Sequence, residues 1–313
     1  TGQWIDENLA KKRPLAVMIG NTSDALPQFG TFSADIIYEV PVEGGYTRMM
    51  AIFQDYSALD KIGSVRSCRH YFLYFAKEFD AIYAHYGQSI YAEPLLAQED
   101  VHNLSGLDGS VGSLVFYRDT NRKAPHNAFA SAEGINAGIE KKGYRTELSS
   151  DYQGHYQFAE DEQEVTLTNG EDALVVSPGY VVNKPWFVYN AEDGLYYRYE
   201  FKDKQIDGAN DQQLAVKNIL IQYCDWSNKD ENGYLDINTT SGGEGVYITN
   251  GKMEQVTWTK ANENSPARYF DESGNEITIN QGKTWVCIVL DSNKDRFHVY
   301  QTEEELQEAR AAE

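Results

Sequence analysis

The residues best suited to chemistry gather in three short stretches of the chain. Residues 63–79 (GSVRSCRHYFLYFAKEF) place two arginines and a histidine directly ahead of an apolar run. Residues 118–127 (RDTNRKAPHN) carry charges of both signs, an imidazole and an amide within ten positions. His85 forms a third candidate, followed closely by Gly87 and Ser89. Because the planar guanidinium group of arginine grips carboxylate, phosphate or sulfate with two hydrogen bonds, the first two stretches favour an anion-binding site.

A helix must position the first stretch. Tyr71, Phe75 and Phe79 recur every four residues and predict a helix with one wide apolar face. Ser67 is the expected N-cap, since its hydroxyl can accept from backbone N–H groups left free in the first turn. Gly63 opens the stretch, ahead of its helical part. The stretch is therefore expected to be the helix around which the rest of the fold is arranged.

The charges at the expected start of this helix have the wrong sign. A helix N-terminus carries a partial positive charge and favours Asp or Glu, yet Arg66, Arg69 and His70 lie there and no acid follows until Glu78. Such an arrangement calls for an anion, and helix N-termini are suited to binding one. The anion is either a ligand or a carboxylate of the chain itself, for which Glu39 and Glu43 are the candidates, and the sequence leaves both alternatives open.

The loop at residues 118–127 is expected to complete the same site. Asp119 and Arg122 lie near its start, and Pro125 stiffens it. Sites commonly form where polar groups of this density lie on a loop beside a rigid scaffold. A loop held together only by its own hydrogen bonds and ion pairs is the competing interpretation. The candidate ligand-binding residues are Glu39, Glu43, Arg48, Arg66, Arg69, His85, Asp119, Arg122, Lys123, His126 and Asn127.

The same residues supply the ingredients of a hydrolase, which is the alternative function. The residue types of a catalytic triad are present in Ser67 or Ser89, His85 or His126, and Asp119, although no G-x-S-x-G elbow is present. Glu39 and Glu43 form a possible carboxylate pair for glycoside hydrolysis. Residues 228–239 imitate a calcium loop but have Thr239 where a bidentate glutamate is required. The sequence predicts no metal and no cofactor.

Composition narrows the possible partners. The chain has 313 residues, 41% of them hydrophobic, and a formal net charge of −21. That charge argues against nucleic acid and against electrostatic adhesion to an anionic membrane surface. Positive charge is nevertheless concentrated locally, because five of the eleven arginines fall between Arg48 and Arg122. No apolar run is long enough to span a membrane, and the start at Thr1 fits a chain trimmed of a targeting segment.

Three cysteines are too few and too scattered for a disulfide framework or a zinc site. Cys224 and Cys287 lie in strand-like apolar runs and are expected to be buried free thiols. Cys68 lies between two arginines, which makes a thiolate conceivable, but a small residue at a helix start is the favoured interpretation.

The hydropathy pattern divides the chain into two blocks. Residues 1–150 alternate apolar strand-like runs with helical segments. The runs at 35–40 and 48–54 favour a hairpin, residues 114–117 a brief strand, residues 90–98 a short helix, and residues 131–142 a helix that Ser131 caps and Gly143 ends. Residues 151–313 read as short strands separated by turns, including the hairpin signal Asn250-Gly251. No low-complexity linker separates the blocks. We therefore expect an α+β protein whose second block packs on the first or shares a sheet with it, with most helices in the first block.

Several segments together resemble the YerB-like lipoprotein family of bacterial extracytoplasmic proteins, which have no established activity. The matching pieces of the first block are VMIGNTSDALPQFG, ADIIYEVPVEGGYTRMMAIF, IGSVRSCRHYF, FDAIYAHYGQS and RDTNRKAPHN. Those of the second are AVKNILIQY, SPARYFDESGNEI and GKTWV, so the resemblance spans about residues 13–290. The chain departs from the family pattern at Gly20, where Asp is usual, and at Cys68, where a smaller residue is usual.

The resemblance implies a three-layer β-β-α sandwich with mixed sheets and an exported or lipid-anchored bacterial protein, with the anchor on a segment ahead of Thr1. Combined with the arginine clusters, it leads us to expect a cell-surface binding or scaffold module for a small anionic or saccharide ligand. A hydrolase of glycans or cell-wall polymers is the alternative.

Overall fold

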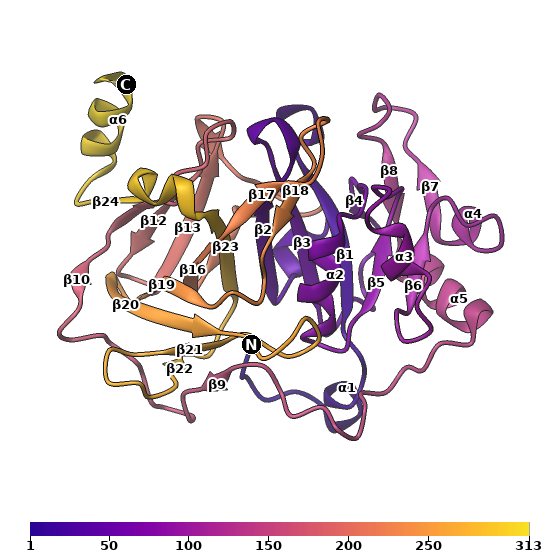
Figure 1. Ribbon diagram of the computed structural model, residues 1–313, viewed down its shortest axis with the longest axis horizontal. Coiled ribbons are helices and arrows are strands. Elements are labelled where there is room, and N and C mark those ends of the chain that lie inside the picture. Colours follow the sequence, from indigo (N-terminus) through magenta and orange to yellow (C-terminus); the bar gives the residue numbers. More distant parts are fainter. Residues whose placement is uncertain (313) are drawn as a thin grey trace.

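One mixed sheet of eleven strands runs through the whole molecule in the computed structural model, which describes residues 1–312 (Figure 1). Its strand order is β10-β20-β19-β16-β23-β2-β3-β1-β5-β6, with β21 paired to β20. The strands are β1 (Leu15–Asn21), β2 (Ile36–Pro41), β3 (Thr47–Phe53), β5 (Ile82–His85), β6 (Asn103–Ser105), β10 (Glu171–Asp172), β16 (Asn218–Cys224), β19 (Gly243–Thr249), β20 (Lys252–Thr259), β21 (Arg268–Phe270) and β23 (Thr284–Leu290).

Strands from both blocks of the sequence meet in the middle of this sheet. β2 pairs in parallel with β23, and β23 pairs in parallel with β16 on its other side. β2 and β3 form the expected antiparallel hairpin. β19 and β20 form the hairpin expected at Asn250-Gly251, where both turn residues have positive φ. The central strand β23 is buried along its entire length, as its continuous apolar sequence predicts.

Six further strands form a second sheet, ordered β14-β13-β12-β11-β24, with β15 paired to β13. These are β11 (Val175–Ser177), β12 (Trp186–Asn190), β13 (Leu195–Glu200), β14 (Asp203–Lys204), β15 (Ala215–Val216) and β24 (His298–Tyr300). Three smaller sheets comprise β4 (Ile62–Gly63) with β8 (Ala128–Ala130) and β7 (Phe116–Arg118), β17 (Trp226–Asn228) with β18 (Leu235–Ile237), and β22 (Thr278–Ile279) with β9 (Gln157–Phe158).

The helices are short and lie mostly in the first block. They are α1 (Glu7–Ala10), α2 (His70–Lys77), α3 (Glu93–Leu96), α4 (Gly112–Val115), α5 (Ala132–Lys142) and α6 (Glu303–Ala312). Four 3-10 turns are η1 (Ser23–Ala25), η2 (Thr31–Ser33), η3 (Glu43–Gly45) and η4 (Asp291–Arg296). α5 begins and ends as predicted, because the Ser131 hydroxyl accepts from Gly134 N–H and Gly143 adopts the left-handed conformation. Within the described chain no helix is long and apolar enough to cross a membrane.

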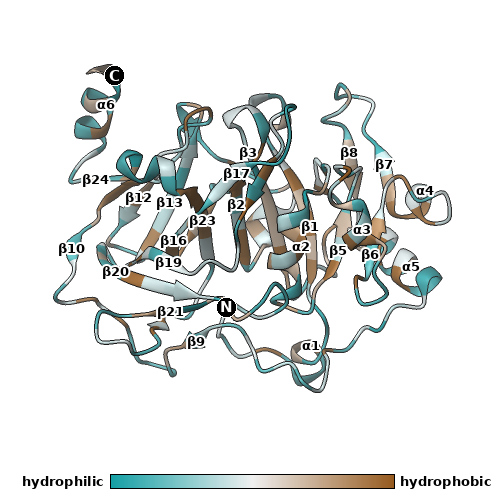
Figure 2. Cartoon of the chain, viewed as in Figure 1, coloured by the Kyte–Doolittle hydropathy of each residue, from teal (hydrophilic) through white to brown (hydrophobic). Residues whose placement is uncertain are grey.

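Successive residues of the large sheet face opposite sides and form two apolar cores. Figure 2 shows in brown the hydrophobic stretches of its central strands. On one face, Leu15, Val17 and Ile19 belong to a core that includes Phe187 of the second sheet and Ile135 of α5. On the other face, Ala16 and Met18 belong to a core that includes Tyr71, Phe72 and Phe75 of α2 and Phe79, which follows the helix. The fold is therefore α+β with β, β and α layers.

Some of the expected elements were wrong in their bounds or type. α2 begins at His70, its N-cap position is Arg69, and no side chain caps it, so Ser67 is not the N-cap. A strand was expected at residues 114–117, but α4 occupies most of that segment and β7 starts only at Phe116. The helix expected at residues 90–98 shortens to the single turn of α3.

Candidate functional site

The candidate site lies at the end of β1, where residues 64–68 run beside it in extended conformation. Gly20 N–H donates to Ser64 O at 2.9 Å, and Arg66 N–H donates to Met18 O at 3.0 Å. Further along, Cys68 N–H donates to Gly87 O at 2.9 Å. These bonds hold residues 64–68 in an extended conformation ahead of α2. Arg66 therefore lies on an extended segment ahead of the helix, not in its first turn, and the predicted stacking of charges on the helix N-terminus was wrong in this respect.

Arg69 is neutralised by a carboxylate of the chain. Its Nε donates to Glu43 Oε1 at 2.7 Å and its Nη2 donates to Glu43 Oε2 at 2.7 Å. Burial by itself raises the pKa of Glu43, but the contact with Arg69 outweighs burial and leaves that pKa below its ordinary value. Of the two alternatives left open by the sequence, an internal carboxylate therefore holds for Arg69.

Glu39 has different partners and does not belong to this cluster. It is fully buried between the two large sheets and accepts from Arg198 Nη2 at 2.7 Å. It also accepts from Thr47 Oγ1 at 2.8 Å and from Trp285 Nε1 at 3.2 Å. Glu39 and Glu43 thus bind separate arginines, so the expectation that Glu39 partners Arg66 or Arg69 was wrong, and the two glutamates do not act as a pair.

Arg48 and Arg66 keep their positive charge without a carboxylate partner among the described residues. Arg48 is largely buried and donates through Nη1 to Ser67 O at 2.7 Å. Arg66 Nη1 is buried and has no hydrogen-bond partner. Burial lowers the pKa of both guanidinium groups, and the charge of Arg69 lowers both further. The three arginines are therefore close enough to repel one another, and only Arg69 is hydrogen-bonded to a carboxylate, although the charge of Glu43 also acts on Arg48.

The 118–127 loop brings His126 to the same place. Burial is the main cause that lowers the pKa of His126, and the charge of Arg66 is the next largest, so the imidazole lies beside that guanidinium. His126 Nδ1 is buried and has no partner. The hydroxyl of Ser64, which lies next to Gly20 and Arg66, is also buried without a partner. Three polar atoms at the end of β1 thus have unused hydrogen-bonding capacity.

Other members of the loop hold the loop itself. Asp119 pairs with Lys61 at 2.6 Å, and Arg122 donates to Ala25 O at 3.0 Å and to Pro27 O at 2.7 Å. Asn127 Oδ1 accepts from Arg118 Nη1 at 2.7 Å. Lys123 is exposed. Asp119, Arg122 and Asn127 therefore stabilise the loop that presents His126.

The groups suggested for covalent chemistry are buried or held by other contacts, and the hydroxyl of Ser89 is buried without a hydrogen-bond partner. His85 is fully buried, with Nδ1 2.7 Å from Gly87 O and Nε2 3.3 Å from Asn103 Oδ1. The Ser67 hydroxyl donates to Tyr86 O. Burial raises the pKa of the Cys68 thiol to about 12, which excludes a thiolate at neutral pH. Over residues 1–312 no serine or threonine hydroxyl is hydrogen-bonded to a histidine, and no cluster of candidate metal ligands occurs.

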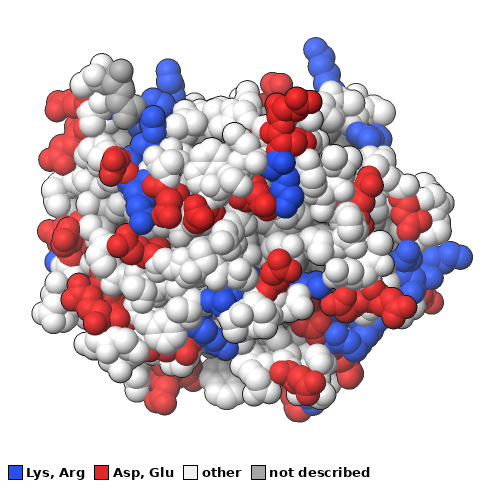
Figure 3. All heavy atoms as spheres, in the orientation of Figure 1, with Lys and Arg blue, Asp and Glu red and all other residues white. Residues whose placement is uncertain are grey.

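The chain is acidic overall, with a formal net charge of −21. Figure 3 shows aspartates and glutamates spread across one face of the molecule, with lysines and arginines in smaller groups between them. Over the described residues, this face carries no extended basic surface suited to a polyanion.

Two family models match most of the chain. Residues 1–145 match the N-terminal domain of a protein of unknown function, DUF3048, and residues 176–286 match the C-terminal domain of the same family. The chain belongs to the DUF3048 family. This DUF3048 protein is 31% identical over 302 residues to "Putative lipoprotein YerB" of Bacillus subtilis (strain 168), covering 93% of this chain and 85% of the relative.

The crystal structure of YerB from Bacillus subtilis has the same fold. It superposes with a TM-score of 0.83 at 29% identity, covering 96% of this chain and 98% of that chain. The resemblance to YerB-like proteins and the α+β fold expected from the sequence are confirmed.

The sequence analysis missed two residues of these clusters, Ser64 and Arg198. No motif singles out Ser64, whereas the alternating pattern of its strand could have indicated Arg198. In β13, residues of the LYYRYE run are buried at alternate positions, and Arg198 occupies one of the inward positions between Tyr196 and Glu200. A charged residue at an inward position of an alternating strand indicates a buried ion pair. The partner, Glu39, is distant in sequence and could not be inferred from the pattern.

Proposed function

We propose that this DUF3048 protein is an exported or lipid-anchored protein of the bacterial cell envelope that binds a ligand through an anionic group. The curated relative's name as a lipoprotein supports the location. The ligand group is a carboxylate, phosphate or sulfate held at Arg66, with Arg48 and His126 beside it. The protein then acts as a binding or scaffold module, because it presents a fixed cationic site without a hydroxyl or thiol poised for covalent chemistry.

The observation that carries the proposal is the unpartnered Nη1 of Arg66. A buried donor on a charged group that lacks a partner costs free energy, typically about 1–3 kcal/mol or more. The neighbouring charges of Arg69 and Arg118 add repulsion at Arg66, and the carboxylate of the cluster, Glu43, is already held by Arg69. An anion bound at Arg66 would reduce both costs, because Arg66 Nη1 can donate to it and His126 Nδ1 can do so in the tautomer that carries its proton on this nitrogen.

Thermal unfolding of the parent protein and of the variants Arg66→Ala and Lys141→Ala tests whether an anion binds at Arg66. The parent is expected to gain stability when sulfate, phosphate or glucuronate is added at constant ionic strength, because a ligand that binds only the folded state raises the melting temperature. Arg66→Ala is expected to melt at the same temperature as the parent or higher, since it relieves repulsion, and to lose the response to the anion.

Lys141→Ala is the matched control, because it removes one positive charge from the exposed end of α5. It is expected to keep the full response. The absence of any anion-dependent shift in the parent would refute the proposal, as would an undiminished shift in Arg66→Ala.

A further inference from the structure

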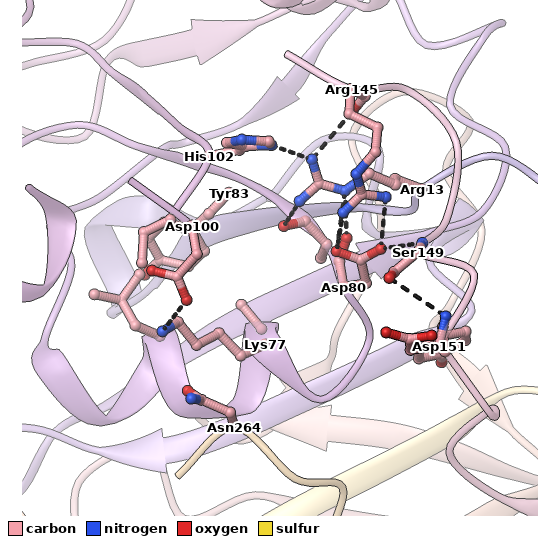
Figure 4. A pocket seen from close by; sticks show the side chains of 15 residues that line it. Arg13, Lys77, Asp80, Tyr83, Asp100, His102, Arg145, Ser149, Asp151 and Asn264 are labelled. Atoms are coloured by element: carbon pink, nitrogen blue, oxygen red, sulfur yellow. Dashed lines mark hydrogen bonds and ion pairs between the residues drawn. The ribbon is translucent and has the colours of Figure 1, made fainter. Parts of the chain in front are cut away.

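A second site with different chemistry lies at the other end of β1. A cavity of about 380 Å³ opens there, close to Arg13, whereas Gly20 and Arg66 lie at the far end of the strand. A seven-residue strand separates the two places by about 20 Å. The cavity joins both blocks of the sequence, since Asn264 lines it together with α2, the segment leading into β6 and residues 145–152 (Figure 4).

The charged groups of this cavity neutralise one another. Asp80 lies between two arginines, accepting from Arg145 Nη1 and Nη2 at 2.8 Å each and approaching Arg13 Nε at 3.4 Å. Lys77 pairs with Asp100 at 3.0 Å. Arg13 also donates to three backbone carbonyls, those of Asp80, Ala81 and Arg145. A strongly charged ligand would have to break these pairs, so the lining does not favour one.

The hydrogen-bonding groups that remain free are mostly neutral. The side-chain amide of Asn264 and the hydroxyl of Tyr152 have no partner among residues 1–312, and Asp151 accepts only a long 3.4 Å contact from Ser150. His102 Nδ1 contacts Arg13 Nη1, which can only donate, so the ring proton lies on Nε2. Burial, followed by the charge of Arg13, lowers the pKa of His102 and keeps it neutral at pH 7.

Apolar side chains line the same cavity, namely those of Leu73, Ala76, Ala81 and Val101. Figure 4 shows Asn264 and Asp151 on different sides of the opening, with His102 further along its wall. A sugar ring matches this arrangement, since each hydroxyl both donates and accepts while the C–H face of the ring packs on apolar carbon. The volume is at the lower end of the range for small-molecule sites and suits one or two rings.

We propose that the cavity lined by Asn264, Asp151, His102 and Tyr152 is a binding site for a neutral saccharide, separate from the anion site at Arg66. The ligand's hydroxyls bond to the amide of Asn264, the carboxylate of Asp151 and Nε2 of His102. The site takes residues from both blocks, so it exists only in the complete chain.

Saturation-transfer NMR and calorimetry on the full chain, with cellobiose and N,N′-diacetylchitobiose as probes, test this site. The parent is expected to bind at least one of them, and Asn264→Ala and Asp151→Asn are each expected to weaken binding by about fivefold or more, the effect of one hydrogen bond. Asn264 and Asp151 are exposed, so both variants are expected to fold.

Asp295→Asn, an exposed aspartate outside the cavity, is the matched control and is expected to bind like the parent. Arg66→Ala is also expected to keep saccharide binding, which separates this site from the anion site. No binding of either probe to the parent at about 10 mM would overturn the proposal. Binding that neither cavity variant weakens would overturn it as well.

Discussion

Arg69 and Glu43 are joined by two parallel hydrogen bonds, each 2.7 Å long. The pair connects the N-cap position of α2 with η3, the turn between β2 and β3. The ring of Tyr234 lies against the guanidinium, with its centroid 5.4 Å from Arg69 Cζ. Because this arginine is already satisfied within the chain, the positive charge available to a ligand comes from Arg48 and Arg66.

Removing either member of this pair should lower stability. Arg69→Ala leaves the partly buried carboxylate of Glu43 without its partner, and we expect a loss of about 1–3 kcal/mol in the free energy of unfolding. The loss is smaller than for a fully buried pair because the side chains are 12% and 24% exposed. Urea unfolding at pH 7 measures it.

The same pair should contribute to acid sensitivity. The pKa of Glu43 is lowered in the folded state, so its contribution is present above the unfolded value near 4.5 and is lost as the pH falls below it. Glu43→Gln should therefore lose stability at pH 7 and approach the parent near pH 3. An equal deficit at both pH values would contradict this origin.

A carboxylate placed at Gly20 should compete with the ligand. A Cβ built at Gly20 lies 3.1 Å from Arg66 Cγ and 3.1 Å from Ser64 Oγ. Gly20→Asp therefore tethers an anion beside Arg66, while Gly20→Asn has nearly the same size and no charge. We expect the aspartate variant to melt higher than the asparagine variant and to lose the response to sulfate. Identical melting temperatures and sulfate responses would show that Arg66 does not sense a charge at this position.

The sheet was largely predictable from the sequence, because its strands carry continuous or alternating apolar runs. The runs of β1, β2, β3 and β23 are buried on both faces, and period-2 patterning assigns their side chains to the two cores. α5 was equally clear, since Ser131 supplies a local start signal and Gly143 a local stop signal.

The start of α2 was not predictable, because it is decided by contacts with distant segments. Ser67 has the right chemistry for an N-cap, but residues 64–68 pair with β1 and with Gly87. The candidate site was also only partly predictable, because contacts with distant segments decide which carboxylate pairs with which arginine. Arginine clustering identified Arg48, Arg66 and Arg69, whereas the choice of Glu43 over Glu39 as the internal partner depends on how the β2–β3 hairpin folds.

Glu200 should make stability depend on pH in the opposite direction to Glu43. It is buried beside Glu39, and burial, the largest cause, raises its pKa to about 7. A group with a raised folded pKa contributes fully below its unfolded value near 4.5 and loses that contribution as the pH rises towards 7. Glu200→Gln imitates the protonated acid, so it should be more stable than the parent by about 1–3 kcal/mol at pH 8 and nearly equal to it at pH 5. Urea unfolding at both pH values checks this, and a variant less stable than the parent at pH 8 would contradict it.

Glu78 should couple the two blocks energetically. This glutamate follows α2 and is buried, and its carboxylate contacts Lys260 Nζ at 2.5 Å and His155 Nε2. The backbone N–H of Ala267 donates to it as well, at 3.2 Å, so these partners all come from the second block. Lys260→Met removes the cation but keeps most of the apolar stem, and it should destabilise by about 3–5 kcal/mol because Glu78 is left buried and charged.

Substituting both partners should recover much of that loss. In Glu78→Gln/Lys260→Met no unpaired charge remains, so a double-mutant cycle of unfolding free energies should show a favourable coupling of about 1–3 kcal/mol between the two positions. Lys252→Met is the control, because Lys252 pairs with Asp172 at the surface, where both side chains are about one-third exposed or more, and it should cost under about 1 kcal/mol. Additive losses at Glu78 and Lys260 would mean that the two blocks are held together by the shared sheet without help from this ion pair.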